Sequence, residues 1–98
     1  LFPEITILSA PSSPQYLKAT AYETTADITW DPPISQNGVI RDYMIGWDCE
    51  TENWGDTKND TVESIGDVRY SYTIKNLPVN TNCEASVMVN IYLSCLFA

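Results

Sequence analysis

The chain contains no histidine, which excludes the two most common arrangements for nucleophilic catalysis. A Ser-His-Asp or Cys-His site needs an imidazole to take the proton from the nucleophile. Thirteen acidic residues remain as candidates for acid–base chemistry, since a pair of carboxylates can hydrolyse a glycosidic bond. No pattern in the sequence places two of these carboxylates in one cleft. The sequence therefore predicts a domain without a catalytic site, and no motif in it indicates a cofactor.

Acidic residues are concentrated in the stretch 50–67, where Lys58 is the only basic residue. A calcium site needs about six to eight oxygen ligands in one place. The spacing Asp56-x-x-x-Asp60-x-x-Glu63 differs from that of an EF-hand loop. We therefore expect no metal site and interpret the stretch as a solvated acidic edge. Charges on an edge strand also discourage pairing with the edge of another sheet.

The triplet Asn59-Asp60-Thr61 matches the acceptor rule for N-linked glycosylation, with a residue other than proline in the middle. It is the only such triplet in the chain. Because short triplets also arise by chance, two interpretations stay open. Asn59 is either a glycosylation site in a secreted protein or an unmodified loop asparagine.

The formal net charge of −8 restricts the partners of the chain. An acidic surface repels the phosphate backbone of nucleic acids and the headgroups of anionic lipids. No apolar run approaches the roughly 20 residues that cross a bilayer. We therefore expect no nucleic-acid partner and no direct membrane contact.

Two runs of alternating apolar and polar residues surround a loop in the centre of the chain. Ile28 and Trp30 share one face in the first run, and Tyr43 and Ile45 do so in the second. The loop 32–38 contains two prolines and an Asn-Gly pair, which stop a strand and favour a turn. A period of two predicts strands with one buried face. Together with the short, punctuated runs elsewhere, this favours an all-β, two-sheet sandwich with a core that includes Trp30, Tyr43, Ile45 and Leu77.

Four segments follow one another along the chain. The first is residues 11–17, and the others are Trp30-Asp31-Pro32-Pro33, then Asn37-Gly38-Val39-Ile40 with Tyr43-x-Ile45-x-Trp47, then Tyr72-x-Ile74-x-x-Leu77-Pro78-x-x-Thr81-x-Cys83-x-Ala85-x-Val87. In this order they resemble strand A, strands B and C, and strands E and F of a fibronectin type III domain, which is an immunoglobulin-like sandwich. The resemblance covers residues 11–91 and implies strands A to F.

The two ends of the chain depart from that pattern. Residues 1–10 contain a short alternating run, interpreted as the last strand of a preceding module followed by a linker. Residues 92–98 form a divergent tail that is too short for the family's last strand, G. Strand G is therefore expected to be missing or replaced, which leaves strand F with unpaired backbone groups. We expect the leader to cover this edge, either parallel to F in its own chain or by pairing with a neighbouring molecule, along Ile5, Ile7, Val87 and Val89.

The resemblance also implies where two of the three cysteines lie. Strand C ends near the start of strand F in this family, so Cys49 and Cys83 are expected to be close. A disulfide and a pair of buried free thiols are both consistent with that position. Cys95 falls in the tail, and an odd cysteine in a secreted chain indicates a free thiol or an intermolecular bond. Cys83 also stands where the family usually has a tyrosine that locks the corner between E and F, so this lock is expected to be missing or replaced.

The resemblance implies a non-catalytic module in the extracellular part of a plasma-membrane receptor or adhesion protein. The tandem arrangement resembles the ectodomains of receptor-type tyrosine-protein phosphatases. The expected partners are neighbouring modules of the same chain, an extracellular protein ligand and, through strand F, a second copy. The alternative is an accessory module of a secreted bacterial carbohydrate-active enzyme, in which Trp54 is the candidate contact to a polysaccharide.

Overall fold

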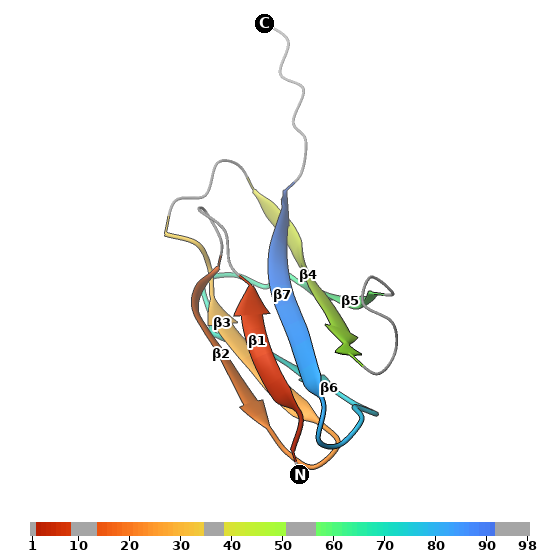
Figure 1. Cartoon of the computed structure of the whole chain (residues 1–98). Coiled ribbons are helices and arrows are strands. Elements are labelled where there is room, and N and C mark those ends of the chain that lie inside the picture. The colour runs from red at the N-terminus through yellow and green to blue at the C-terminus, as the bar shows by residue number, and fades with distance from the viewer. Residues whose placement is uncertain (1, 9–13, 35–38, 51–56, 92–98) are drawn as a thin grey trace, which may run out of the picture.

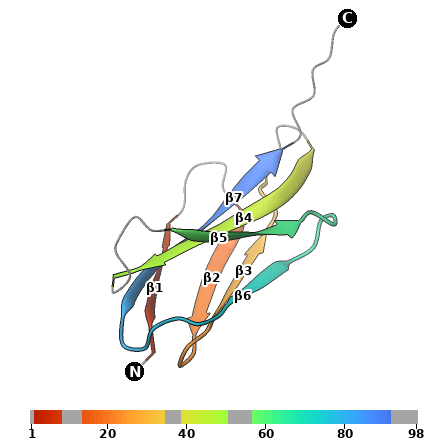
Figure 2. The same ribbon diagram turned by 90° about the vertical axis from the view of Figure 1, so that its right-hand side faces the viewer.

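The computed structural model describes residues 2–8, 14–34, 39–50 and 57–91, which form two β-sheets packed face to face. One sheet has the strand order β1-β7-β4-β5 and the other β2-β3-β6 (Figure 1 and Figure 2). The strands are β1 (Glu4–Leu8), β2 (Gln15–Ala21), β3 (Ala26–Asp31), β4 (Ile40–Cys49), β5 (Lys58–Glu63), β6 (Tyr70–Ile74) and β7 (Asn82–Ile91). The predicted all-β sandwich is confirmed. No helix in the described part of the chain is long and apolar enough to cross a membrane.

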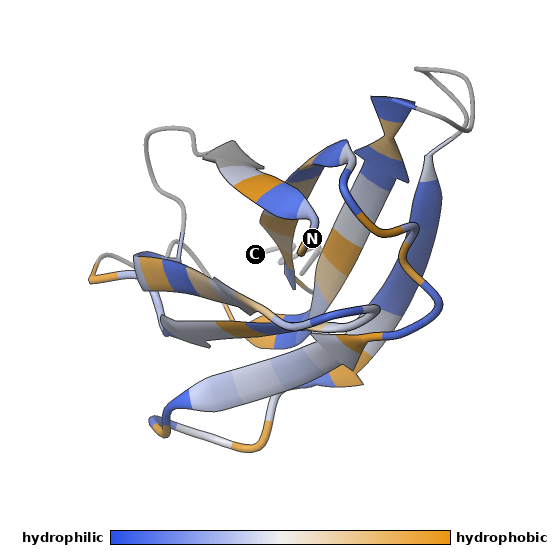
Figure 3. Cartoon of the chain, turned by 60° about the horizontal axis from the view of Figure 1, so that its bottom comes forward, coloured by the Kyte–Doolittle hydropathy of each residue, from blue (hydrophilic) through white to orange (hydrophobic). Residues whose placement is uncertain are grey.

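The core is built around three aromatic rings from both sheets. Trp30 on β3 and Tyr43 on β4 are fully buried, with ring centroids 5.5 Å apart. Tyr70 on β6 lies 5.9 Å from Trp30 and 4.7 Å from Tyr43. Ile45 and Leu77 are buried in the same cluster. Polar and apolar residues alternate along most of the strands (Figure 3). A period of two gives each sheet one apolar face.

The edge of β7 is occupied by β1, which runs parallel to it (Figure 1). The register runs from Glu4 opposite Asn82 to Leu8 opposite Ser86. The short connection to β2 explains the direction, because the six residues between the two strands reach only about 20–22 Å. An antiparallel β1 would end a strand length away from the start of β2. The leader is thus a strand of this sandwich, in the position expected for strand G.

β1 covers only the first half of β7. Val87 and Val89 lie beyond the last register pair, at Ser86, and pair with β4 on their other side. Within the residues that the structure describes, no strand pairs with β7 on the β1 side of this second half. Ile5 packs against the core from β1, and the backbone of Ile7 pairs opposite Ala85.

The acidic stretch contains a strand that the sequence did not predict. β5 pairs antiparallel with β4, with Val62 opposite Tyr43 and Asp60 opposite Ile45. Val62 is its only apolar residue, so the period-two signal is absent. Backbone pairing with the central strand β4 is what holds β5 in place. Its exposed charged residues suit an edge position, because they discourage pairing with another sheet.

Candidate interaction surface

One end of the sandwich gathers exposed apolar side chains. β2, β4 and β6 begin at this end, and β3 and β7 end there. Six of the ten large apolar residues exposed in the described part of the chain lie here, with 40% to 85% of their surface accessible. We call this set the apolar end: Tyr16, Ile34, Val39, Ile65, Val68 and Ile91. Exposed apolar residues that gather in one place mark contact surfaces more often than scattered ones do.

A groove of about 620 Å³ opens within the apolar end. Its walls come from the start of β2, the segment after β3 and the segment before β6. Tyr16, Ile34 and Val68 supply apolar surface, while Asp31 and Arg69 supply charge. The groove is lined by more polar than apolar surface, so it offers charged and hydrogen-bonding groups beside the exposed apolar side chains.

Arg69, just before β6, bonds to two strands beside this groove. Its guanidinium donates from Nη1 to Asp31 Oδ1 at 2.9 Å and from Nη2 to Thr29 Oγ1 at 2.9 Å, both on β3. Nη2 also donates to the carbonyl oxygen of Tyr16 on β2, at 3.4 Å. An exposed ion pair contributes little to stability on its own. Arg69 instead acts by position, because its hydrogen bond to the Tyr16 carbonyl links the backbone that presents Tyr16 to β3.

Tyr16 has an unusual backbone conformation. Its φ of 53° is in the left-handed region, which costs a residue with a Cβ atom about 1 kcal/mol. The strand register shifts between Gln15 and Lys18, so Tyr16 lies in a bulge that turns its ring outward. The side chain is 74% exposed and therefore gains little from burial. Strained positions of this kind concentrate at binding sites.

The loop that carries Ile65 and Val68 is anchored to the core. The Tyr70 hydroxyl accepts a hydrogen bond from Ile65 N at 3.0 Å and donates one to the Gly66 carbonyl at 2.5 Å. Gly66 has a φ of 116°, which a residue with a side chain rarely adopts. Because Tyr70 also belongs to the aromatic cluster, the core determines the position of this part of the apolar end.

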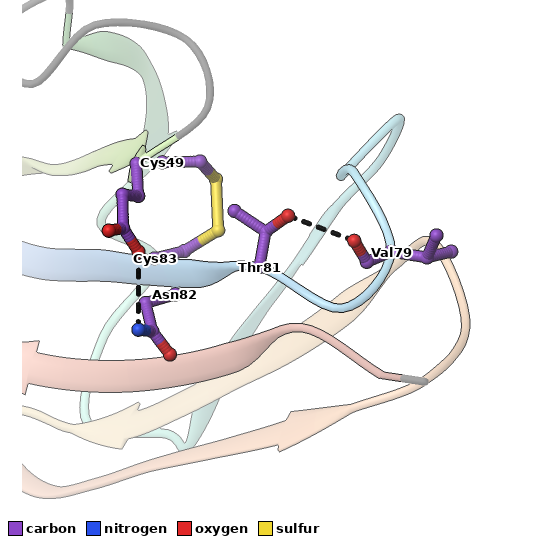
Figure 4. Close-up of a disulfide and its surroundings, with 6 residues drawn as sticks. Cys49, Val79, Thr81, Asn82 and Cys83 are labelled. Atoms are coloured by element: carbon purple, nitrogen blue, oxygen red, sulfur yellow. Dashed lines mark hydrogen bonds between the residues drawn. A yellow bond between two sulfur atoms is a disulfide. The ribbon is translucent and has the colours of Figure 1, made fainter.

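The structure joins Cys49 and Cys83 by a disulfide at the opposite end of the sandwich (Figure 4). The two residues are direct register partners on β4 and β7, so the bond lies within one sheet. Both side chains are only 2% exposed. The nearby Thr81 hydroxyl donates to the Val79 carbonyl at 2.9 Å (Figure 4). A covalent bond therefore stands at the position where the family usually has its corner tyrosine.

The fibronectin type III domain family matches residues 12–90. The chain belongs to the fibronectin type III family. Members are generally non-catalytic modules that contact other proteins. No curated protein matches the chain. Among solved structures, a computationally redesigned β-sandwich protein is 20% identical, with a TM-score of 0.53, and the match covers 88% of this chain and 96% of that one. At this identity the likeness supports the fold alone.

The remaining residues singled out in the sequence have different positions in this fibronectin type III domain. Asn59 lies on β5 and is exposed. Trp54, Cys95 and the Asn37-Gly38 pair lie outside the described residues. No group of three or more potential metal ligands occurs in the part of the chain that the structure describes. Sequence reasoning missed Arg69 and Tyr16, although an aromatic residue on the polar face of the β2 alternation was an available signal for Tyr16.

A hydrogen bond connects the open edges of the two sheets in this domain. The Tyr72 hydroxyl on β6 donates to Asp60 Oδ2 on β5 at 2.8 Å, and Thr61 N donates to Asp60 Oδ1 at 2.8 Å. The bond from Tyr72 has the larger effect and the bond from Thr61 N the smaller, and both hold the pKa of Asp60 below its ordinary value. Burial, followed by the bond to Asp60, raises the pKa of Tyr72 to about 12.

We expect a Tyr72→Phe variant to raise the pKa of Asp60 toward the ordinary value of an aspartate. A lowered folded-state pKa contributes stability above the unfolded-state pKa, and this contribution is lost as the pH falls through the folded-state pKa. The variant should therefore be less stable than the wild type at pH 7 and nearly equal to it at pH 2. NMR titration of the Asp60 carboxyl group and melting curves at both pH values test this. An unchanged Asp60 pKa in the variant would contradict the assignment of the hydrogen bond.

Proposed function

We propose that this domain is an extracellular, non-catalytic module that binds a protein partner through its apolar end. The observation that carries the proposal is the strained and exposed Tyr16, held beside the groove by Arg69. Exposed aromatic residues at a rigid position are the side chains that most often dominate protein interfaces. The buried disulfide supports an oxidising compartment, since such bonds persist mainly in secreted and cell-surface proteins.

The parent protein that fits this proposal is a cell-surface receptor or adhesion protein in which the domain also spaces and orients its neighbours. A receptor-type tyrosine-protein phosphatase of the phosphatidylinositol phosphatase Q type is the specific parent that we propose. The alternative of a bacterial carbohydrate-active enzyme depends on Trp54, which lies outside the described residues, and no described feature favours it. Labelling of intact cells with a membrane-impermeant reagent tests the setting. Labelling that requires permeabilised cells would overturn it.

The binding surface is tested with a fluorescent tetramer of the domain on cells that display the partner. We expect Tyr16→Ala to reduce the apparent affinity roughly 30-fold, which corresponds to the loss of about 2 kcal/mol typical of an aromatic anchor. Tyr22→Ala is the matched control, because Tyr22 is 46% exposed and follows the end of β2 at the opposite end. Equal affinity of the two variants would exclude the apolar end as the binding surface.

We also propose that the second half of β7 supports weak self-association. Val87 and Val89 lie on an edge that no described strand covers, and such an edge can pair with a second copy. Sedimentation velocity over a range of concentrations should then show a reversible dimer. A monomer at every concentration up to about 1 mM would exclude this association, because a contact weaker than that contributes little.

A further inference from the structure

The edge strand β5 presents the single glycosylation triplet of the chain to solvent. Residues that are paired across an antiparallel ladder point to the same face of the sheet. Ile45 is fully buried, so its partner Asp60 is on the face turned toward the other sheet, although Asp60 itself is exposed at the sheet edge. Asn59, opposite Gly46, and Thr61, opposite Met44, therefore point away from the sandwich. The register therefore places Asp60 on one face of β5, and places Asn59 and Thr61, which define the triplet, on the opposite face.

The side-chain bonds agree with this separation. The Asp60 carboxylate accepts from Tyr72 and from the backbone of Thr61, and these bonds hold it toward the other sheet. Asn59 and Thr61 are both exposed. Neither the Asn59 carboxamide nor the Thr61 hydroxyl is hydrogen-bonded to another described residue. Both groups of the acceptor triplet are therefore accessible.

The surface beside Asn59 also leaves room for a bulky group. Gly46 has no side chain, and a shallow pocket of about 190 Å³ lies over this part of the sheet. Thr57, Glu84 and Ser86 contribute to its wall. Across the sheet, Asn59 is in register with Gly46 and Ser86, whereas Met44 and Met88 are in register with Thr61.

We propose that Asn59 carries an N-linked glycan on the outer face of the four-stranded sheet. In the reaction, the Asn59 amide nitrogen bonds to C1 of a lipid-diphosphate-linked oligosaccharide. The lipid diphosphate leaves and the nitrogen loses one proton, so no oxidant or reductant is required. A bulky, hydrated group at this position also shields the outer edge of β5, which no described strand covers, from other strands. The proposal rests on the extracellular setting proposed above.

Secretion of the chain from mammalian cells, behind an added signal peptide, tests the site. Intact mass should show one N-glycan, and enzymatic release of the glycan should convert Asn59 to aspartate. Thr61→Val, which keeps the shape of the side chain and removes its hydroxyl, should abolish the modification, as should Asn59→Gln. Thr61→Ser is the matched control and should retain it. Melting curves of the released proteins verify that each variant folds.

A secreted, folded wild-type chain with an unmodified Asn59 would overturn the glycosylation site. A glycan that persists in Thr61→Val would overturn it as well. Because the added signal peptide delivers the chain to the secretory pathway whatever its natural location, these results concern the site alone. Surface labelling of the parent protein tests the extracellular setting separately.

Discussion

A Trp30→Ala variant should lose about 4 kcal/mol of free energy of unfolding, a value typical of a large aromatic residue removed from a core. Trp30 is fully buried and contacts the rings of Tyr43 and Tyr70 from the two sheets. Alanine would leave a cavity that β-strands held in two ladders cannot close. Because a small domain is stable by only about 5–15 kcal/mol, the variant should unfold at a much lower urea concentration.

Tyr43→Phe is the matched control for this core. The Tyr43 hydroxyl is buried and has no hydrogen-bonding partner among the described residues, and burial raises its pKa to about 12. Removing an unsatisfied buried hydroxyl costs nothing and can add about 1 kcal/mol. In the same urea titration, the midpoint of unfolding should therefore fall for Trp30→Ala and stay equal or rise for Tyr43→Phe. A Trp30→Ala variant within about 1 kcal/mol of the wild type would mean that this ring does not join the two sheets.

The central strands could be predicted from the sequence because their residues follow one rule. In β3, the alternation through Ile28 and Trp30 reports directly which face is buried. In β4, Tyr43 and Ile45 do the same. Packing of two apolar faces then requires two layers, whatever the details of the loops. The alternation therefore predicts the two-sheet fold, although it does not show which strands pair with each other.

β5 and the surface around Tyr16 could not be predicted in the same way. β5 exists because β4 offers a free backbone ladder, and its own residues carry almost no hydrophobic signal. The unusual conformation of Tyr16 occurs at a register shift between β2 and β3, and its carbonyl accepts a hydrogen bond from Arg69, which lies 53 positions away in the chain. Contacts between such distant residues are properties of the fold and leave no local pattern.

The two ends of the domain differ in structure. One end is closed by a buried disulfide, and the other exposes apolar side chains and a strained backbone. Tyr70 connects the apolar end to the core, because its ring packs in the core and its hydroxyl holds the loop of Ile65 and Gly66. Stability gained in the core and at the disulfide can thus offset the strain at Tyr16. The proposed binding at the apolar end therefore requires a fold that is stabilised by the core and the disulfide.

Removal of the disulfide should therefore lower the stability of the domain by a large amount. A Cys49→Ala/Cys83→Ala double variant should lose about 3.8 kcal/mol, the loop-closure value for a bond between residues 34 positions apart. The double change is needed because a single variant would leave a thiol able to pair with Cys95. Cys95→Ser, which keeps the bond, is the matched control and should match the wild type in urea. Since the β4–β7 ladder remains, the folded double variant should keep its affinity at the apolar end while melting at a lower temperature. A double variant as stable as the control would mean that the disulfide does not constrain the unfolded chain.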